Sequence, residues 1–98
     1  MFAGSKKNIS ITKKLIMYNY LITFQEYRTN DTIKEKVNSI SFLNRGGVCT
    51  INNNRLENGE VLAISGNAGE ENEQSWKISF ADPNANTNNI LVTIKKYV

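Results

Sequence analysis

Apolar residues recur at every second position through much of this chain, a pattern typical of β-strands that bury one face. The alternation is clearest in four segments: 16–24, 37–44, 76–80 and 90–94. In the first, Tyr20, Ile22 and Phe24 fall on one side, which we interpret as the core side of one long strand or of two strands broken by a bend. Turn signals such as Asn58-Gly59 separate the segments. The pattern predicts an all-β fold, a small antiparallel β-sandwich of jelly-roll or Ig-like type with about seven short strands.

The 98 residues suffice for a single domain. We expect one β-sandwich over residues 1–98, in which residues 1–14 are a candidate arm that contacts neighbouring subunits. Segment 25–36 is the least clear, because Thr32 and Glu35 have the spacing of a capping box and also allow a single helical turn.

The charged residues are unevenly distributed. Residues 57–73 hold five of the 9 acids and no base, so the rest of the chain carries all 12 lysines and arginines. Such a division favours docking between complementary surfaces, although a solvated surface would look the same. The residues that we select as candidate interaction sites are Lys6, Lys7, Lys13, Lys14, Lys95, Lys96, Glu70, Glu71 and Glu73.

Several kinds of chemistry lack the residues that they need. The chain contains no histidine and one cysteine, Cys49, which excludes an intrachain disulfide, a histidine base and the usual zinc ligand sets. Glu70, Glu71 and Glu73 lie in a glycine-flanked loop, where solvent would keep all three ionised. Asp82 opens an Asn-rich segment that resembles a calcium loop but lacks its glycine and its final glutamate, so we interpret it as a hairpin loop. We therefore predict that the protein is not an enzyme and binds no metal or cofactor.

Two binding functions remain as alternatives. Trp76 and the Asn-rich loops suggest a small glycan-binding module, although Trp76 alternates with Ile78 and Phe80 as a core residue would. Tyrosines near the basic ends suggest a small barrel that binds single-stranded nucleic acid. The residues for that role are Tyr18, Tyr20, Tyr27 and Tyr97. Arginine is scarce, and we regard nucleic acid as the lesser alternative.

The second half of the chain has a recurring order of turns and strands. Its components are residues 44–47, 50–52, 56–60, 64–70, 76–80 and 89–97. Over about residues 40–98 this order resembles small all-β virion proteins of tailed bacteriophages, especially the crAss-like phages and their relatives. The resemblance rests on a Gly-Glu hairpin, a Gly-Asn loop, an aromatic strand and a basic final strand.

The resemblance implies a structural part of a virus particle, either an auxiliary (decoration) capsid protein or a head-fibre or tail component. The expected partners are the major capsid, fibre or tail protein and further copies of this chain, in an oligomer or a large assembly. Neither nucleic acid nor a membrane is an expected partner. No signal peptide is evident, so we expect synthesis in the host cytoplasm and a final location in the virion.

Overall fold

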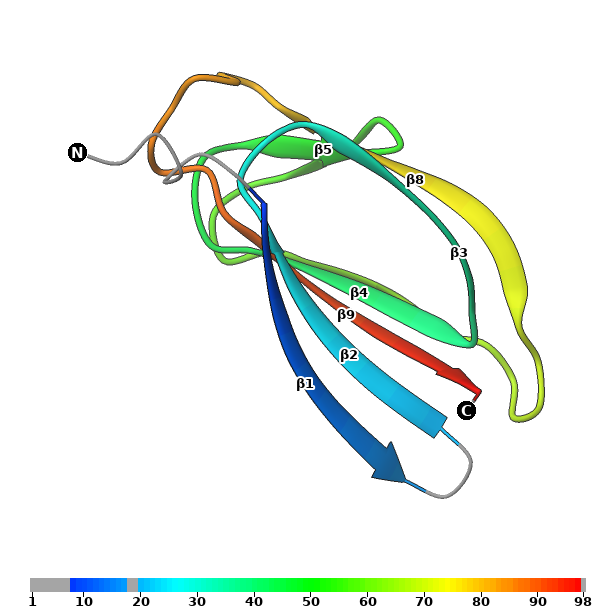
Figure 1. Cartoon of the computed structure of the whole chain (residues 1–98). Coiled ribbons are helices and arrows are strands. Elements are labelled where there is room, and N and C mark those ends of the chain that lie inside the picture. Colours follow the sequence, from blue (N-terminus) through cyan, green and yellow to red (C-terminus); the bar gives the residue numbers. More distant parts are fainter. Residues whose placement is uncertain (1–7, 18–19, 98) are drawn as a thin grey trace.

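The computed structural model describes residues 8–17 and 20–97, which form two antiparallel sheets that face each other (Figure 1). The strands in chain order are β1 (Ile9–Met17), β2 (Tyr20–Tyr27), β3 (Asp31–Val37), β4 (Ser39–Asn44), β5 (Cys49–Ile51), β6 (Asn54–Leu56), β7 (Val61–Ile64), β8 (Asn72–Phe80) and β9 (Ile90–Tyr97). The described residues contain no helix. The predicted antiparallel β-sandwich is therefore confirmed, with nine strands instead of about seven.

The strand order mixes early and late parts of the chain. The first sheet has the order β1-β2-β9-β4-β7 and the second the order β3-β8-β5-β6. The final strand, β9, therefore lies in the middle of the five-stranded sheet, paired with β2 from Tyr20↔Tyr97 to Tyr27↔Ile90. Because β8 and β9 belong to different sheets, the segment that begins at Asp82 connects the two layers and is not the predicted hairpin loop.

The core lies between the two sheets. Its buried residues are Tyr27, Ile33, Val37, Ile40, Phe42, Cys49, Ile51, Leu56, Trp76, Ile78, Phe80, Ile90, Val92 and Ile94. Trp76 is 2% exposed, and its ring lies 6.4 Å from that of Phe42 in a tilted arrangement. Each such side chain contributes roughly 1.5–3 kcal/mol by leaving water. The interpretation of Trp76 as a core residue is confirmed, and Cys49 is also buried in the core.

The prediction for β2 was wrong about which side faces the core. Tyr27 pairs with buried Ile90, and Thr23 pairs with Ile94, so the odd-numbered residues of β2 point inward. Tyr20, Ile22 and Phe24 consequently lie on the outer side, where they are half-buried. Alternation shows that residues share a face, but it does not show which face is covered.

The segment that we considered as a helical turn is strand β3. Seven consecutive residues pair with β8, from Asp31↔Ile78 to Val37↔Asn72. Ile33 enters the core from this strand. Burial and pairing along a whole strand outweigh a local capping pattern, because the environment of a strand decides its stability more than propensity does.

Two asparagines form the turn between β5 and β6. Asn52 and Asn53 have φ angles of 49° and 69° and connect the paired strands β5 and β6. Two successive left-handed residues are what a tight hairpin requires, and asparagine tolerates that conformation.

Candidate interaction surface

The exposed side of the five-stranded sheet carries half-buried apolar residues that are not part of the core. We call this surface, between β2 and β7, the outer face. Its cross-strand rows are Glu26, Leu91, Leu43 and Val61; Phe24, Thr93, Ser41 and Ala63; Ile22, Lys95 and Ser39; and Tyr20 with Tyr97. Large side chains on β2 and the small Ser39 and Ser41 on β4 give this face an uneven relief.

A shallow trough follows the small residues of the outer face. Its volume is about 200 Å³, and the residues that line it include Ser39, Ser41, Ala63, Thr93 and Lys95. Small-molecule sites usually have volumes of ~300–1,000 Å³. A trough of this size is better suited to side chains of a contacting protein than to an enclosed ligand.

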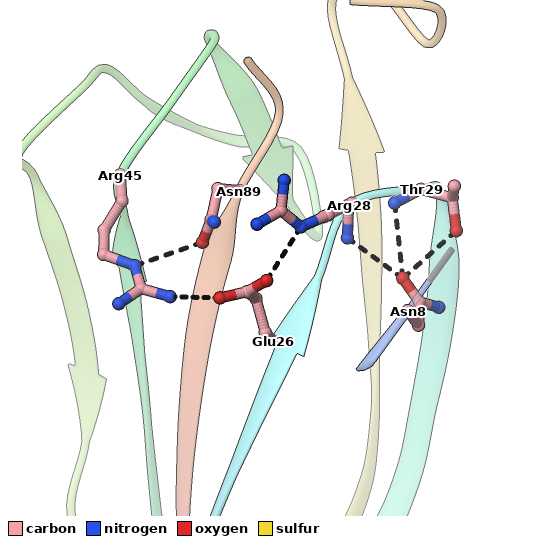
Figure 2. Close-up of polar contacts among 6 residues, drawn as sticks. All are labelled: Asn8, Glu26, Arg28, Thr29, Arg45 and Asn89. Atoms are coloured by element: carbon pink, nitrogen blue, oxygen red, sulfur yellow. Dashed lines mark hydrogen bonds and ion pairs between the residues drawn. The ribbon is translucent and has the colours of Figure 1, made fainter. Parts of the chain in front are cut away.

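An ionic cluster closes one end of the outer face (Figure 2). Arg28 Nε donates to Glu26 Oε1 at 2.7 Å, and Arg45 Nη2 donates to Glu26 Oε2 at 2.8 Å. Arg45 Nε also donates to Asn89 Oδ1 at 3.1 Å. Glu26 is 8% exposed, so both of its oxygens depend on these arginines. The cluster links the end of β2, the residue that follows β4 and the residue that precedes β9.

The arginines determine the charge state of Glu26. Burial by itself would raise the pKa of this carboxyl group. The hydrogen bond from Arg28 and the positive charges of Arg28 and Arg45 outweigh burial, so the pKa of Glu26 is lowered. The group remains ionised and continues to bind both arginines well into the acidic range.

Asn8 extends this polar arrangement to the beginning of β1 (Figure 2). Its Oδ1 accepts hydrogen bonds from the backbone N–H of Arg28 at 3.0 Å and from the hydroxyl of Thr29 at 3.1 Å. Its Nδ2 donates to Asp31 Oδ2 at 2.8 Å. One side chain thus holds the start of β1 against the turn between β2 and β3.

An aromatic pair lies at the opposite end of the outer face. Tyr20 and Tyr97 stack with ring centroids 4.8 Å apart, and Lys95 Nζ lies 4.2 Å from the centroid of the Tyr20 ring. The hydroxyl oxygens of Tyr20 and Tyr97 are 3.4 Å apart and form a hydrogen bond. This hydrogen bond lowers the pKa of Tyr20 and raises that of Tyr97. A stacked pair beside an ammonium group is a cation–π arrangement that can also receive a flat ligand.

The structure separates the two predicted lysines of β9. Lys95 lies on the outer face, whereas its neighbour Lys96 forms an ion pair with Glu35 at 3.1 Å. Adjacent strand residues point to opposite sides, so the two cannot form one basic patch.

The three predicted acids are held separately. Glu71 Oε2 accepts the backbone N–H of Tyr97 at 2.7 Å, and Glu70 Oε1 accepts that of Asn67 at 3.2 Å. Glu73 is exposed on β8 opposite Lys36. Glu71 thus lies beside the basic end of β9, and acidic and basic residues are interleaved in this region.

The N-terminal lysines can be placed only in part. Lys6 and Lys7 lie outside the described residues. Lys13 and Lys14 belong to β1, for which the structure describes the backbone. Residues 9–14 of the candidate arm therefore form part of the five-stranded sheet.

The residues behind the two alternative binding functions have different environments. Trp76 is buried, so it offers no stacking surface to a sugar. Tyr27 is also buried, and desolvation together with Asp31 and Glu35 raises its pKa to about 12. Tyr18 lies outside the described residues. Tyr20 and Tyr97 alone among the four tyrosines are seen at a half-buried surface.

The described residues contain no group of three or more His, Cys, Asp or Glu side chains that could hold a metal ion. In the segment examined as a calcium loop, Asp82 Oδ1 accepts the backbone N–H of Asn84 at 3.1 Å, which is an ordinary turn contact. In residues 8–17 and 20–97 we find no helix long and apolar enough to cross a membrane.

Sequence reasoning missed the Glu26 cluster. Glu26 lies near the end of β2 and Arg28 just after it, two positions apart, but Arg45 lies 19 residues away from Glu26. The alternating Glu-Arg pair after a run of apolar residues was the available signal. This Glu-Arg pair does not predict that β2 and β4 both pair with β9, which is what brings Arg45 close to Glu26.

Comparisons with known proteins concern the fold. No family model matches the chain, and no curated protein matches it. A cupin superfamily protein from Desulfitobacterium hafniense superimposes with a TM-score of 0.52 at 12% identity, over 100% of this chain and 84% of that one. A cupin-2 domain protein from Shewanella frigidimarina gives 0.42 at 13% identity, over 93% and 79% of the two chains. The Clostridium difficile EutQ protein gives 0.39 at 16% identity, over 99% and 74%.

The first of these similarities agrees with the two-layered β-sandwich described above. At 12% identity it concerns the arrangement of strands alone. A function for this chain has to be argued from its own surface.

Proposed function

We propose that this protein is a non-enzymatic structural subunit that binds and stabilises neighbouring subunits of a larger particle. The outer face is the observation that carries the proposal. Tyr20, Ile22 and Phe24 are half-buried there without belonging to the core. Apolar surface that the chain's own layers leave uncovered, bordered by charged groups, is typical of protein contact sites.

The strands that form the outer face are extensively hydrogen-bonded to one another. β9 is paired on both sides, with β2 over eight positions and with β4 over six. At one end of these strands, the hydrogen bonds of Glu26 with Arg28 and Arg45 and of Asn8 with Arg28 hold neighbouring segments together. A force applied at a contact on the outer face is therefore distributed over the paired strands of the whole sheet.

The specific assignment within this proposal is a virion protein of a tailed bacteriophage. It rests on the resemblance of residues 40–98 to small all-β virion proteins. The partners would be the major capsid, fibre or tail protein and other copies of this chain. An auxiliary capsid protein, a head fibre or a tail component would each use the outer face in the same manner.

The test is to measure how much of the chain enters purified particles. We expect particles purified on a density gradient to contain many copies of the protein, and Phe24→Ser to lower that number severalfold. Thr32→Ser is the matched control, because Thr32 is exposed on β3 in the other sheet. If the chain is absent from particles, the proposal is wrong. If both variants are incorporated like the natural protein, the outer face is not the contact.

A second candidate function is supported by the aromatic pair. Tyr20 and Tyr97 with Lys95 could stack a base and contact a phosphate of single-stranded nucleic acid. Binding of a labelled oligonucleotide should then weaken steeply between about 50 and 200 mM salt and be lost in Tyr97→Ala. No binding, or binding that ignores salt, would eliminate this candidate. For the glycan-binding alternative, the buried Trp76 offers no ring surface on which a sugar could stack.

A further inference from the structure

Strand β7 is an open edge of the five-stranded sheet. It pairs with β4 on one side, and no described strand lies on its other side. Among the residues whose burial the structure describes (8 and 20–97), both large apolar side chains that are exposed belong to this strand: Val61 at 57% and Ile64 at 39%. An apolar edge of this kind is a ready template for pairing with another strand.

The other three edge strands are protected by charge. β1 contains Lys13 and Lys14, at an irregularity of register between Ile11 and Leu15. β3 contains Asp31 and Lys34 with further charged residues, and β6 contains an arginine. The four residues of β7 are Val-Leu-Ala-Ile, with no charge. Charged residues and bulges are devices that prevent edge pairing, and residues 61–64 contain neither. Both features occur just before the strand: Glu60 is charged, and Gly59 N donates to Asn44 O while Asn44 N donates to Glu60 O, so two residues lie opposite Asn44.

The hydrogen bonds identify which backbone groups of β7 remain available. Asn44 N donates to Glu60 O at 3.0 Å, so the pair 44/60 is hydrogen-bonded. Hydrogen-bonded pairs alternate along an antiparallel ladder, and therefore Leu62 and Ile64 also direct their backbone groups to β4. The N–H and C=O groups of Val61 and Ala63 therefore point to the open side, and we extend the same alternation by one position to Ser65, which follows β7.

We infer that two copies of this chain join through β7, antiparallel about a twofold axis at Ala63. In this register Ala63 is opposite Ala63 of the second copy, and Val61 is opposite Ser65 of the second copy. These are the residues whose backbone groups are available, and each such pair exchanges two hydrogen bonds. The five-stranded sheets of the two copies become one continuous sheet.

The same register matches the side chains. Leu62 and Ile64 lie on the inner side of β7. In the dimer, Leu62 of each copy would lie opposite Ile64 of the other copy. Their exposed surface would then be covered by apolar partners. Glu60, the nearest charged residue, falls opposite Gly66 of the second copy. No two like charges therefore meet directly across the contact.

The size of the contact determines its strength. A pairing of about five residues per strand buries much less than the ~1,600 Å² of a standard interface. We expect a weak dimer that depends on protein concentration in solution and becomes firm where other contacts hold the two copies together. The inference rests on the proposed structural role and specifies one of its partners.

Cysteine crosslinking tests the register. Cα atoms of a hydrogen-bonded antiparallel pair are ~5.5 Å apart, within the ~4.4–6.8 Å span of a disulfide. Under mild oxidation Ala63→Cys should therefore form a covalent dimer. Val61→Cys is the matched control, because its two copies would lie about 14 Å apart. The natural Cys49 is fully buried and should remain unreactive.

We expect at least roughly tenfold more crosslinked dimer from Ala63→Cys than from Val61→Cys. Equal crosslinking of both variants, or none of either, overturns the inference.

A second measurement avoids cysteine. Ala63→Pro removes an N–H that faces the open edge, so it should abolish dimers in sedimentation equilibrium, while Ala63→Ser should preserve them. A natural protein that stays monomeric at millimolar concentration, yet is incorporated into particles, would refute the β7 pairing alone. Absence from particles would refute the proposed function.

Discussion

Replacing Glu26 by glutamine removes the negative charge between Arg28 and Arg45 while keeping the size of the side chain. Glu26 now accepts two hydrogen bonds from charged groups, at 2.7 and 2.8 Å. Such bonds contribute roughly 1.5–3 kcal/mol each when shielded from water. The arginine side chains are 28% and 39% exposed, so solvent screens the pairs and replaces part of the loss. We expect the free energy of unfolding at pH 7 to fall by about 1–2 kcal/mol.

Thermal unfolding followed by circular dichroism measures this loss, which corresponds to a melting temperature lower by roughly 4–16 °C in a domain of this size. The effect depends on pH in a defined direction. Because the folded protein lowers the pKa of Glu26, its stabilising contribution is complete above the ordinary carboxyl range and disappears as the pH falls below about 4. The two proteins should therefore converge in stability in strong acid.

The control for this experiment is Glu57→Gln. Glu57 is an exposed residue whose ion pair with Arg55 has a separation of 3.9 Å, and its replacement should change stability by less than about 0.5 kcal/mol. If Glu26→Gln melts like the natural protein at pH 7, or if the difference persists unchanged at pH 2, the cluster does not fasten the sheet as described.

Three further predictions concern the packing. Ile51→Val should lower the free energy of unfolding by about 1 kcal/mol in urea titrations, since Ile51 is fully buried; no change would show that the core is loosely packed there. Gly46→Ala should cost about 1–3 kcal/mol in the same titration, because its Cβ would lie 1.8 Å from the carbonyl oxygen of Thr87, and a neutral result would contradict that close approach. Cys49 should resist a thiol reagent at pH 8 until denaturant is added, because burial raises its pKa to about 11; rapid labelling of the native protein would disprove its burial.

The fold was largely predictable because alternation shows which residues of a strand share one face. Trp76, Ile78 and Phe80 alternate in the sequence and enter the core together. The inward side of β2 was not predictable, because Tyr20 and Phe24 alternate just as regularly while facing outward. Hydrophobic alternation would have the same appearance whether a face is covered by the chain itself or by a neighbour.

The interaction surface was much less predictable than the fold. Its rows are set by the register of β9 between β2 and β4, which joins residues far apart in the chain, such as Tyr20 and Tyr97, 77 positions apart. Lys95 and Lys96 were selected together from their sequence, yet alternation along β9 sends them to opposite faces. Long-range pairing therefore decides which charges can act as one site.

Electron cryomicroscopy of the assembled particle tests the central claim most directly. We predict density for this β-sandwich at regularly repeated positions, with the outer face against a neighbouring subunit and β7 beside β7 of a second copy. A particle without such density, in which the outer face of every located copy points into solvent, would contradict it.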